Sequence, residues 1–404
     1  MKNNRKPEIR FLGYTEGWVQ RKLDSIVDRV KSYSLSRDVE TSEYTGYKYI
    51  HYGDIHTKVA DVIDESSNLP NIKAGNYELL EKGDLVLADA SEDYQGIATP
   101  AVITIDIPYK LVSGLHTIAL RPKQVDPLFL YYLINSPTFR KYGYKTGTGM
   151  KVFGISVTNL LKFEGMFPLL EEQTKIGNFL KQLDDTIALQ QQELTTLKQT
   201  KQGFLQKMFP KEGESVPEVR FPGFTGNWEE RKMGEVATFI NGRAYKQHEL
   251  LNSGKYKVLR VGNFYTNNSW YYSDLELGEK YYAEKGDLLY TWSATFGPHI
   301  WYGDKVIYHY HIWKVGLSDN LDKQFTIQLL EYDKAKILSD KNGSTMVHIT
   351  KKGMEEKKVL LPSLEEQTKI GNFFKQLDDA IAFHQRELEA LKETKKAFLQ
   401  KMFV

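Results

Sequence analysis

The segment Glu171-Glu-Gln-Thr-Lys-Ile-Gly-Asn-Phe179 returns letter for letter as Glu365-Glu-Gln-Thr-Lys-Ile-Gly-Asn-Phe373. The match continues to Phe209 in the first copy and to Phe403 in the second, and roughly three quarters of the paired positions are identical. Near-identity over so long a segment indicates an internal duplication, which determines how the rest of the chain is divided.

In both copies the apolar residues alternate at spacings of four and three, which is the pattern of the a and d positions of a coiled coil. We therefore expect two helices of ~38 residues, each ~57 Å long, that bury this stripe against one another. The first helix delivers the chain to the second half. A second helix that returns along it must be antiparallel, and the C-terminus should finish near the N-terminal domain. The seam positions are Ile176, Leu180, Leu183, Ile187, Leu194, Leu197, Phe204 and Met208 in the first copy and Ile370, Phe374, Leu377, Ile381, Leu388, Leu391, Phe398 and Met402 in the second.

Polar residues interrupt both seams at matching positions, as expected where register matters more than stability. The matching pairs are Gln190 with His384 and Lys201 with Lys395. Ser363 and Glu366 predict a capping box at the start of the second helix, and Pro210 and Gly213 predict the end of the first.

A second, shorter repeat precedes each of the remaining segments. Pro7-Glu-Ile-Arg-Phe11 returns as Pro217-Glu-Val-Arg-Phe221, and a tryptophan and a basic pair follow in both copies. Each half thus consists of a leader, a globular part and a helix. The expected boundaries are 1–165 for the leader and first globular domain, 166–210 for the first helix, 211–359 for the leader and second globular domain, and 360–404 for the second helix.

The globular parts share only short islands of sequence and consist of short apolar and aromatic runs punctuated by glycine, which is typical of strands. One such run is Val306–Trp313, and short helices are expected at 127–135 and 325–338. The expected fold class is α+β: two β-rich domains separated by two long antiparallel coiled-coil helices, with a pseudo-two-fold duplication. Nearly constant helices that carry divergent domains suggest one frame presenting two different readers.

The composition excludes several classes of function. The 404 residues include no cysteine, which excludes disulfides, thiolate zinc sites and cysteine nucleophiles and fits a reducing cytoplasm. A net charge of +2 counts against DNA binding by phosphate neutralisation alone, whereas the 25 tyrosines can hydrogen-bond to bases or stack on them. No run approaches the ~18 apolar residues of a membrane span, so we expect a soluble cytoplasmic protein.

Sequence motifs for catalysis are also missing. The chain has neither a Gly-x-x-x-x-Gly-Lys-Ser/Thr phosphate loop nor an Asn-Pro-Pro-Tyr/Phe methyltransferase motif, so we expect no cofactor and no catalysis by this chain itself. His309 and His311 would share one face of a strand and could ligate a metal, but no carboxylate follows at close spacing, and no metal site is expected. The nuclease-like Glu355-Glu-Lys357 and Glu393-Thr-Lys395 are interpreted as charged surface.

Two diverged domains, each followed by a Leu-Glu-Glu-Gln…Leu-Asp-Asp…Phe-Leu-Gln-Lys-Met-Phe helix, resemble the specificity subunit of type I restriction-modification enzymes. The resemblance covers essentially the whole chain. It implies that the globular parts are target recognition domains, each reading half of a bipartite site in double-stranded DNA. It also implies that the helices set the gap and help to hold two methyltransferase subunits, with restriction subunits as further partners.

Candidate DNA-contacting residues are expected on loops that leave the strands, where side chains can reach a groove. In the first domain they are Tyr33, Arg37, His51, Asp54, Tyr94, Gln95, Lys145, Thr148 and Lys151. In the second they are Arg243, Tyr245, Lys246, Arg260, Asn263, Trp292, Ser293, Thr295, His299, Lys341, Asn342, Ser344 and Thr345. Solvated loop surface is the alternative for each residue taken singly.

Two other functions remain open on the sequence. A coiled-coil adaptor whose two β-rich domains bind proteins would tolerate the near-neutral charge, and a sharp salt dependence of DNA binding would distinguish it from a DNA reader. A self-contained nuclease or methyltransferase ranks last because the motifs it needs are missing.

Overall fold

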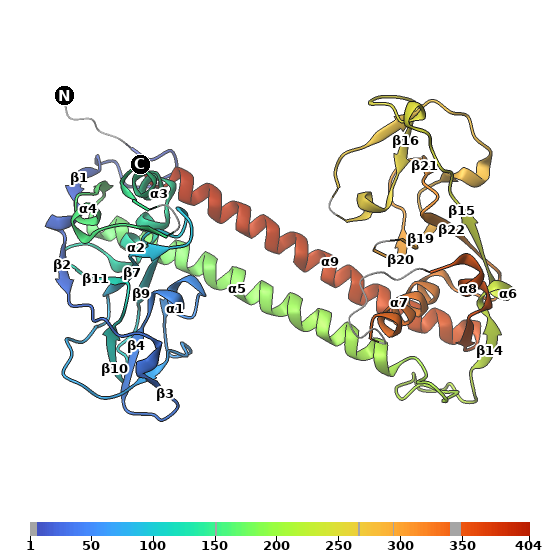
Figure 1. Cartoon of the computed structure of the whole chain (residues 1–404), viewed down its shortest axis with the longest axis horizontal. Helices are drawn as coiled ribbons and strands as arrows, with labels where there is room; N and C mark the ends of the chain where they lie inside the picture. Colours follow the sequence, from blue (N-terminus) through green and yellow to red (C-terminus); the bar gives the residue numbers. More distant parts are fainter. Residues whose placement is uncertain (1–5, 150–151, 266, 294, 340–348) are drawn as a thin grey trace. The chain divides into compact units, whose positions relative to one another are not determined.

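The computed structural model describes residues 6–149, 152–265, 267–293, 295–339 and 349–404. The chain forms two compact units, the first made of residues 1–191 and 386–404 and the second of residues 192–385. Both divisions fall inside long helices, so each unit contains the start of one helix and the end of the other (Figure 1).

The two predicted helices are confirmed as α5 (Leu170–Lys207) and α9 (Leu364–Lys401), each of 38 residues. In the first unit the start of α5 packs against the end of α9, where the rings of Phe179 and Phe398 meet edge to face at 4.9 Å. In the second unit Phe204 and Phe373 make the matching contact at 5.0 Å. The two helices therefore run antiparallel within each unit, as the seam predicts.

Ion pairs occupy one polar position of each seam. Lys395 pairs with Asp184 in the first unit, and Lys201 pairs with Asp378 at 2.5 Å in the second. A globular-domain side chain donates to each aspartate, from the Tyr132 hydroxyl at 2.8 Å to Asp184 and from Gln328 Nε2 at 3.1 Å to Asp378. A shift of helix register would break these contacts, which supports the interpretation of Lys201 and Lys395 as register determinants.

The leader repeat anchors the start of each helix. Arg10 donates from Nε and Nη2 to the buried carboxylate of Glu172 at 2.6 and 2.7 Å, and Arg220 holds Glu366 in the same way. The predicted capping box is half correct. Ser363 Oγ accepts the amide of Glu366 at 3.3 Å, but the Glu366 carboxylate binds Arg220 instead of returning to the Ser363 amide.

The next repeated residues fix each helix against its globular domain. Gln173 Oε1 accepts the amide of Asp126, which caps α2 (Pro127–Asn135), at 3.0 Å. Gln367 does the same for Asp322, ahead of α7 (Lys323–Ser339). A Cβ at Gly177 would lie 2.9 Å from the amide nitrogen of Phe129, so glycine permits the close approach of α5 and α2. The identical residues of the repeat therefore form the same connection between the long helix and the globular domain in both units.

Three sheets carry most of the first globular domain. A five-stranded sheet has the order β2-β11-β7-β9-β5, a four-stranded sheet has the order β10-β4-β6-β3, and β1 pairs with β13 just before α5. The strands are β1 (Val19–Lys22), β2 (Val27–Val30), β3 (Glu40–Thr41), β4 (Tyr47–Ile50), β5 (Val62–Ile63), β6 (Asn71–Ile72), β7 (Leu85–Ala88), β8 (Ala90–Ser91), β9 (Pro100–Ile103), β10 (Lys110–Ser113), β11 (Thr117–Pro122), β12 (Phe153–Gly154) and β13 (Glu164–Phe167). The shorter helices are η1 (Leu23–Ser25), η2 (Arg37–Val39), α1 (Tyr52–His56), α2, α3 (Pro137–Thr146) and α4 (Val157–Leu161).

The second domain repeats this plan. Its sheets have the orders β15-β22-β19-β20 and β17-β16-β21-β18, and β14 pairs with β23 just before α9. The strands are β14 (Glu229–Lys232), β15 (Ala237–Asn241), β16 (Tyr256–Leu259), β17 (Tyr271–Ser273), β18 (Tyr282–Ala283), β19 (Leu288–Thr291), β20 (Gly297–Ile300), β21 (Val306–Tyr308), β22 (Ile312–Leu317) and β23 (Lys358–Leu361). The shorter helices are α6 (Met233–Val236), η3 (Gln247–Glu249), η4 (Val261–Phe264), η5 (Glu279–Tyr281), α7 and α8 (Lys351–Glu356).

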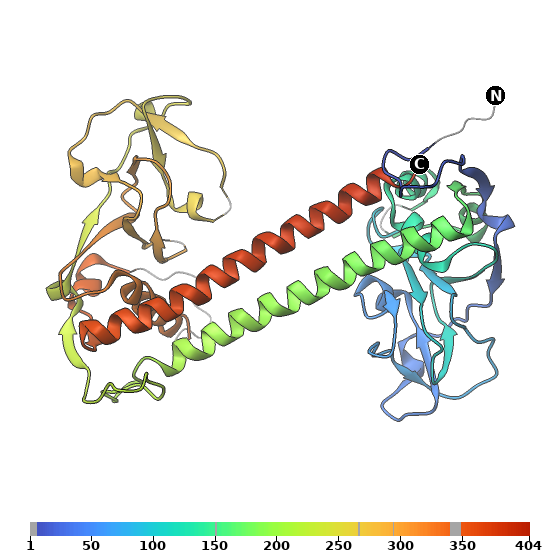
Figure 2. The same cartoon turned by 180° about the vertical axis from the view of Figure 1, so that it is seen from behind.

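The end of each long helix enters a globular core. Phe403 lies 5.3 Å from the Phe129 ring in the first unit, and Phe209 lies 5.5 Å from the Phe325 ring in the second. The C-terminus therefore belongs to the first unit, as predicted (Figure 2). No helix within the described ranges has the length and hydropathy to cross a membrane.

One strand prediction is wrong. The run Val306–Trp313 is divided between β21 and β22, and residues 309–311 form the turn that joins them. The predicted helices at 127–135 and 325–338 are present as α2 and α7.

Candidate functional site

Four chain segments meet at one place in the first unit, all of them where strands end. We call this set the first junction: residues 33–37 after β2, 51–54 after β4, Asp89 after β7, and the turn 114–116 between β10 and β11. Main-chain hydrogen bonds hold the segments together, including Leu115 N to Leu35 O at 3.1 Å and Asp89 N to His116 O at 3.0 Å.

The equivalent segments of the second unit meet in the same way. The second junction comprises residues 243–246 after β15, 260–263 after β16, Trp292 after β19, and the turn 309–311. Tyr310 N donates to Arg243 O at 3.1 Å, and Trp292 N donates to His311 O at 3.1 Å. The two junctions share a main-chain frame although their side chains differ.

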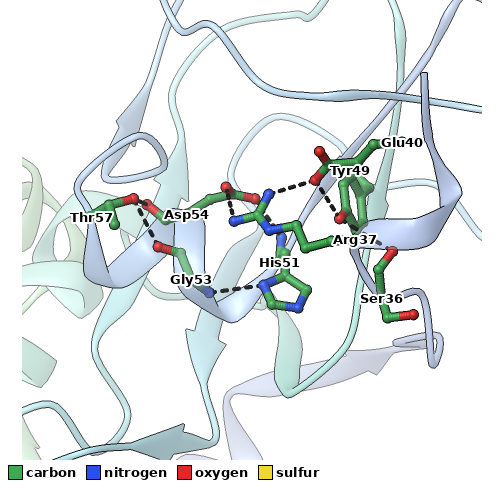
Figure 3. Close-up of polar contacts among 8 residues, drawn as sticks. All are labelled: Ser36, Arg37, Glu40, Tyr49, His51, Gly53, Asp54 and Thr57. Atoms are coloured by element: carbon green, nitrogen blue, oxygen red, sulfur yellow. Dashed lines mark hydrogen bonds and ion pairs between the residues drawn. The ribbon is translucent and has the colours of Figure 1, made fainter. Parts of the chain in front are cut away.

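Figure 3 shows that the first junction is built around an arginine and two carboxylates. Arg37 donates to Glu40 at 2.6 Å and to Asp54 at 2.7 Å, and the Tyr49 hydroxyl donates to Glu40 at 2.8 Å. Burial alone would lower the pKa of Arg37, but these hydrogen bonds to Glu40 and Asp54 raise it. The guanidinium is thus fixed in position while 46% of the side chain stays exposed.

His51 and Asp54 of the first junction are turned inward. His51 Nδ1 accepts the amide of Gly53 at 3.1 Å, and the Asp54 carboxylate accepts the amide of His51 at 2.9 Å, which closes a capping box on α1 (Figure 3). Burial, together with the nearby Arg37 charge, lowers the pKa of His51. Both residues are largely buried, whereas the side chain of His116 on the turn is half-exposed.

The second junction is dominated by aromatic rings. Trp292 Nε1 donates to Tyr310 O at 2.9 Å, and the indole meets the His311 ring edge to face at 5.0 Å. Arg243 donates twice to Glu249, at 3.0 and 2.6 Å, and its guanidinium lies 5.2 Å from the Tyr245 ring centre. The side chain of Tyr310, on the turn of the second junction, is exposed.

His309 and His311 of the second junction are neutral at physiological pH. Burial lowers the pKa of His309 to about 4, with smaller contributions from His311 and Arg260, and burial likewise lowers the pKa of His311. A neutral imidazole offers one donor and one acceptor rather than a charge. The hydrogen bonds from Arg243 lower the pKa of Glu249 to about 2, so that ion pair persists across the physiological range.

Four further candidates of the first unit, Tyr94, Gln95, Lys145 and Thr148, lie outside the first junction. The Tyr94 ring lies 4.0 Å from Phe153 and is stacked with Tyr144 at 5.8 Å. Exposed polar residues accompany these rings, namely Gln95, Lys145 and Thr148. The Tyr33 hydroxyl accepts the amide of Glu78 at 2.7 Å, which makes Tyr33 a support of the first junction. Lys151 lies outside the described residues.

Some candidates of the second unit have side chains used in contacts within the protein, and others have exposed side chains. Asn263 accepts the amide of Arg260 at 3.0 Å and donates to the carbonyls of Asn267 and Ser269, so its amide is used within the loop. His299 stacks on Phe264 at 4.1 Å, and burial lowers its pKa to about 4. Lys246 and Thr295 are exposed and Ser293 is half-buried. Four candidates lie outside the described residues: Lys341, Asn342, Ser344 and Thr345.

The expectation that all candidates occupy loops is wrong for five of them. Each lies in a short helix or a strand, where its orientation is fixed by the local hydrogen bonding. These residues are Arg37 in η2, Asp54 in α1, Lys145 in α3, Asn263 in η4 and His299 in β20. Whether any candidate contacts DNA stays a prediction.

The sequence interpretation missed several junction residues, namely Tyr52, Asp89, His116 and Tyr310. One signal was available, because an alignment of the two halves of the sequence places His311 near His116. In the structure both residues directly precede equivalent strands, β11 and β22. His309 and His311 lie on a turn rather than on one strand face. Among the described residues, no three potential metal ligands gather into a site.

Similarity to known proteins covers nearly the whole chain. The family described as "Type I restriction modification DNA specificity domain" matches twice, at residues 15–199 and 225–393. A Methanocaldococcus jannaschii protein described as the MjaX specificity subunit of a type I restriction enzyme is 24% identical over 420 residues, covering 98% of this chain and 95% of that protein. The MjaVIII specificity subunit from the same organism is 25% identical, with 72% of each chain covered.

Solved structures share the fold. The S subunit of a type I restriction-modification system from M. genitalium superposes with a TM-score of 0.64 at 17% identity, covering 99% of both chains. A chain from a study of assembly and conformational transition of the type I R-M system superposes with a TM-score of 0.55 at 17% identity, covering 95% of this chain and 97% of that one.

Proposed function

The chain belongs to the family of type I restriction modification DNA specificity domains, and we propose that each of its two units reads one half of a bipartite site on double-stranded DNA. The observation that carries this proposal is the pair of junctions. The same four segments meet in both units, held by equivalent main-chain hydrogen bonds, yet they present different side chains.

The chemistry of the junctions suits base recognition. The first combines a fixed arginine with a half-exposed histidine, and the second presents neutral imidazoles, an arginine and exposed aromatic rings. Such groups donate, accept and stack without adding much charge, and base edges in the major groove are distinguished by that donor and acceptor pattern. The net charge of +2 then leaves part of the phosphate neutralisation to partner subunits.

The helices are the proposed spacer and the proposed docking surface for two methyltransferase subunits. Leu189 on α5 and Phe383 on α9 occupy matching positions of the repeat and are 54% and 53% exposed. A large apolar side chain left in water at the same position of both copies suits a partner that binds twice. Restriction subunits would join the same assembly, which supplies the catalysis that this chain does not.

Exchange of one globular domain tests the two-reader proposal. Residues 229–359 are replaced by the corresponding segment of another family member, with the long helices unchanged, and methylated sites are mapped in cells that supply the other subunits. We expect one half of the recognised site to change and the other half and the gap to stay. A change in both halves would contradict two independent readers.

The matched control exchanges residues 19–165 and should change the opposite half only. Loss of all DNA binding, with retained binding of a protein through either domain, would favour the adaptor function instead. Binding titrations at rising salt separate these outcomes, because DNA affinity falls steeply with salt concentration.

A further inference from the structure

The turn of the first junction contains a strained residue. His116 has φ 54°, the left-handed region that favours glycine. Its side chain is 51% exposed, so burial of an apolar group does not explain why a histidine occupies this position. Retained strain of this kind is concentrated at functional sites.

Contacts on two sides orient the His116 ring. Nδ1 lies 3.1 Å from Oδ1 of Asp89, and the Tyr52 ring meets the imidazole edge to face at 5.3 Å. The main chain of Asp89 also donates to the His116 carbonyl at 3.0 Å, so one residue holds both the backbone and the ring. A carboxylate accepts hydrogen bonds but cannot donate them, so Nδ1 carries the hydrogen.

This arrangement leaves Nε2 available. In the neutral ring it is a hydrogen-bond acceptor, and Nε2 has no hydrogen-bond partner within the described ranges of the chain. The second junction differs at this point, because Trp292 stands where Asp89 stands in the first. His311 therefore packs against an indole rather than a carboxylate.

We infer that His116, oriented by Asp89, is a specificity-determining residue of the first unit that accepts a hydrogen bond from the exocyclic amino group of one base in the major groove. The bases that carry such a group there are adenine, at N6, and cytosine, at N4. Asp89 is a positioning residue that acts through the ring. The inference rests on the proposed function and names one contact within it.

The test is His116→Gly in the full complex, with specificity read as relative affinity for single-base variants of the recognised site. Glycine suits the left-handed backbone, so the fold should be retained. We expect discrimination at one base pair of the first half-site to fall about tenfold, equivalent to ~1.4 kcal/mol, with the second half-site unchanged. Asp89→Ala should weaken discrimination at the same base pair.

A base analogue supplies an independent measurement. Replacing the recognised adenine or cytosine by the same base without its amino group should weaken binding by the unmodified complex about tenfold and by the glycine variant not at all. Gln124→Gly is the matched control, because Gln124 is exposed with φ 55° and lies outside the junction.

Two results would overturn the inference: unchanged discrimination in His116→Gly, or a change confined to the second half-site. These failures are distinguishable from failure of the proposed function. If domain exchange still alters one half-site while His116→Gly alters none, only the contact is wrong. If domain exchange alters no half-site, the two-reader proposal itself fails.

Discussion

Removing the guanidinium from the first leader should destabilise the first unit strongly. In Arg10→Met the aliphatic stem is largely kept, but the carboxylate of Glu172, whose side chain is fully buried, loses both of its charge-assisted hydrogen bonds. The hydrogen bond to Glu172 also raises the pKa of Arg10. Breaking a buried pair by removing one partner costs ~3–5 kcal/mol.

A double replacement separates loss of the pair from loss of packing. In the double variant Arg10→Met, Glu172→Leu, neither position of the pair carries a buried charge. Apolar replacement of a whole buried ion pair is often neutral or stabilising for the fold. The double variant also removes Arg10 Nη1, a buried nitrogen without a hydrogen-bond partner in the described structure. We therefore expect the double variant to recover to within ~1 kcal/mol of the unmodified chain.

Hydrogen exchange measured by mass spectrometry under native conditions is the appropriate assay because it resolves the two units. Peptides from the start of α5 should lose ~3–5 kcal/mol of opening free energy in Arg10→Met, whereas peptides from the start of α9 should change by less than ~0.5 kcal/mol. Lys175→Met is the control on the same helical turn, since its pair with Glu171 is exposed. An Arg10→Met effect no larger than that control, or no recovery in the double variant, would refute the reasoning.

Three further outcomes are expected. Inserting one heptad into both helices, between Leu183 and Leu197 and between Leu377 and Leu391, adds ~10 Å to each helix and should lengthen the gap selected from a random-gap DNA library by up to ~3 base pairs, whereas an unchanged gap at full affinity would show that the helices are not the spacer. The purified chain without partners should transfer no labelled methyl group to DNA, and detectable transfer would contradict its proposed non-catalytic role. Because burial lowers the pKa of His299 to about 4, the unfolded chain binds more protons between that pH and the ordinary value, so stability should fall on acidification from pH 6.5 to 4. Thermal unfolding of His299→Phe should show a smaller loss over this range, and an equal loss would assign the pH dependence to other groups.

The repeated helix segment illustrates how far sequence reasoning reaches. Its apolar spacing predicts the position, length and pairing of α5 and α9, and the structure confirms them. The same segment also contains Glu172 and Gln173, whose buried contacts with the leader and with Asp126 no periodicity indicates. The exact repetition of these polar residues in the second copy was the available signal of their importance. It did not indicate which contacts they make.

Sequence reasoning was less informative for the candidate DNA-contacting residues than for the helices. Residue type and an expected place on loops after strands located Arg37, Arg243 and Trp292, which do lie in the junctions, but gave no reason to select Asp89 or Tyr310. His51 and Asp54 were chosen as surface groups and are largely buried capping residues. A capping box and a surface site use the same polar side chains, so composition cannot separate them.

The sequence alone therefore determines the duplication, the two long helices and the α+β character of both domains, because helical and strand periodicity and repetition are local properties of the chain. Tertiary structure alone decides that residues 309–311 turn rather than continue a strand, and that the segments carrying Arg37, Asp89 and His116 meet at one junction. The physical reason is that each junction is assembled by main-chain hydrogen bonds between the ends of strands far apart in sequence. Whether these strand ends meet depends on how the strands pair in the sheets and on which face each strand buries. No single segment of the sequence determines either property.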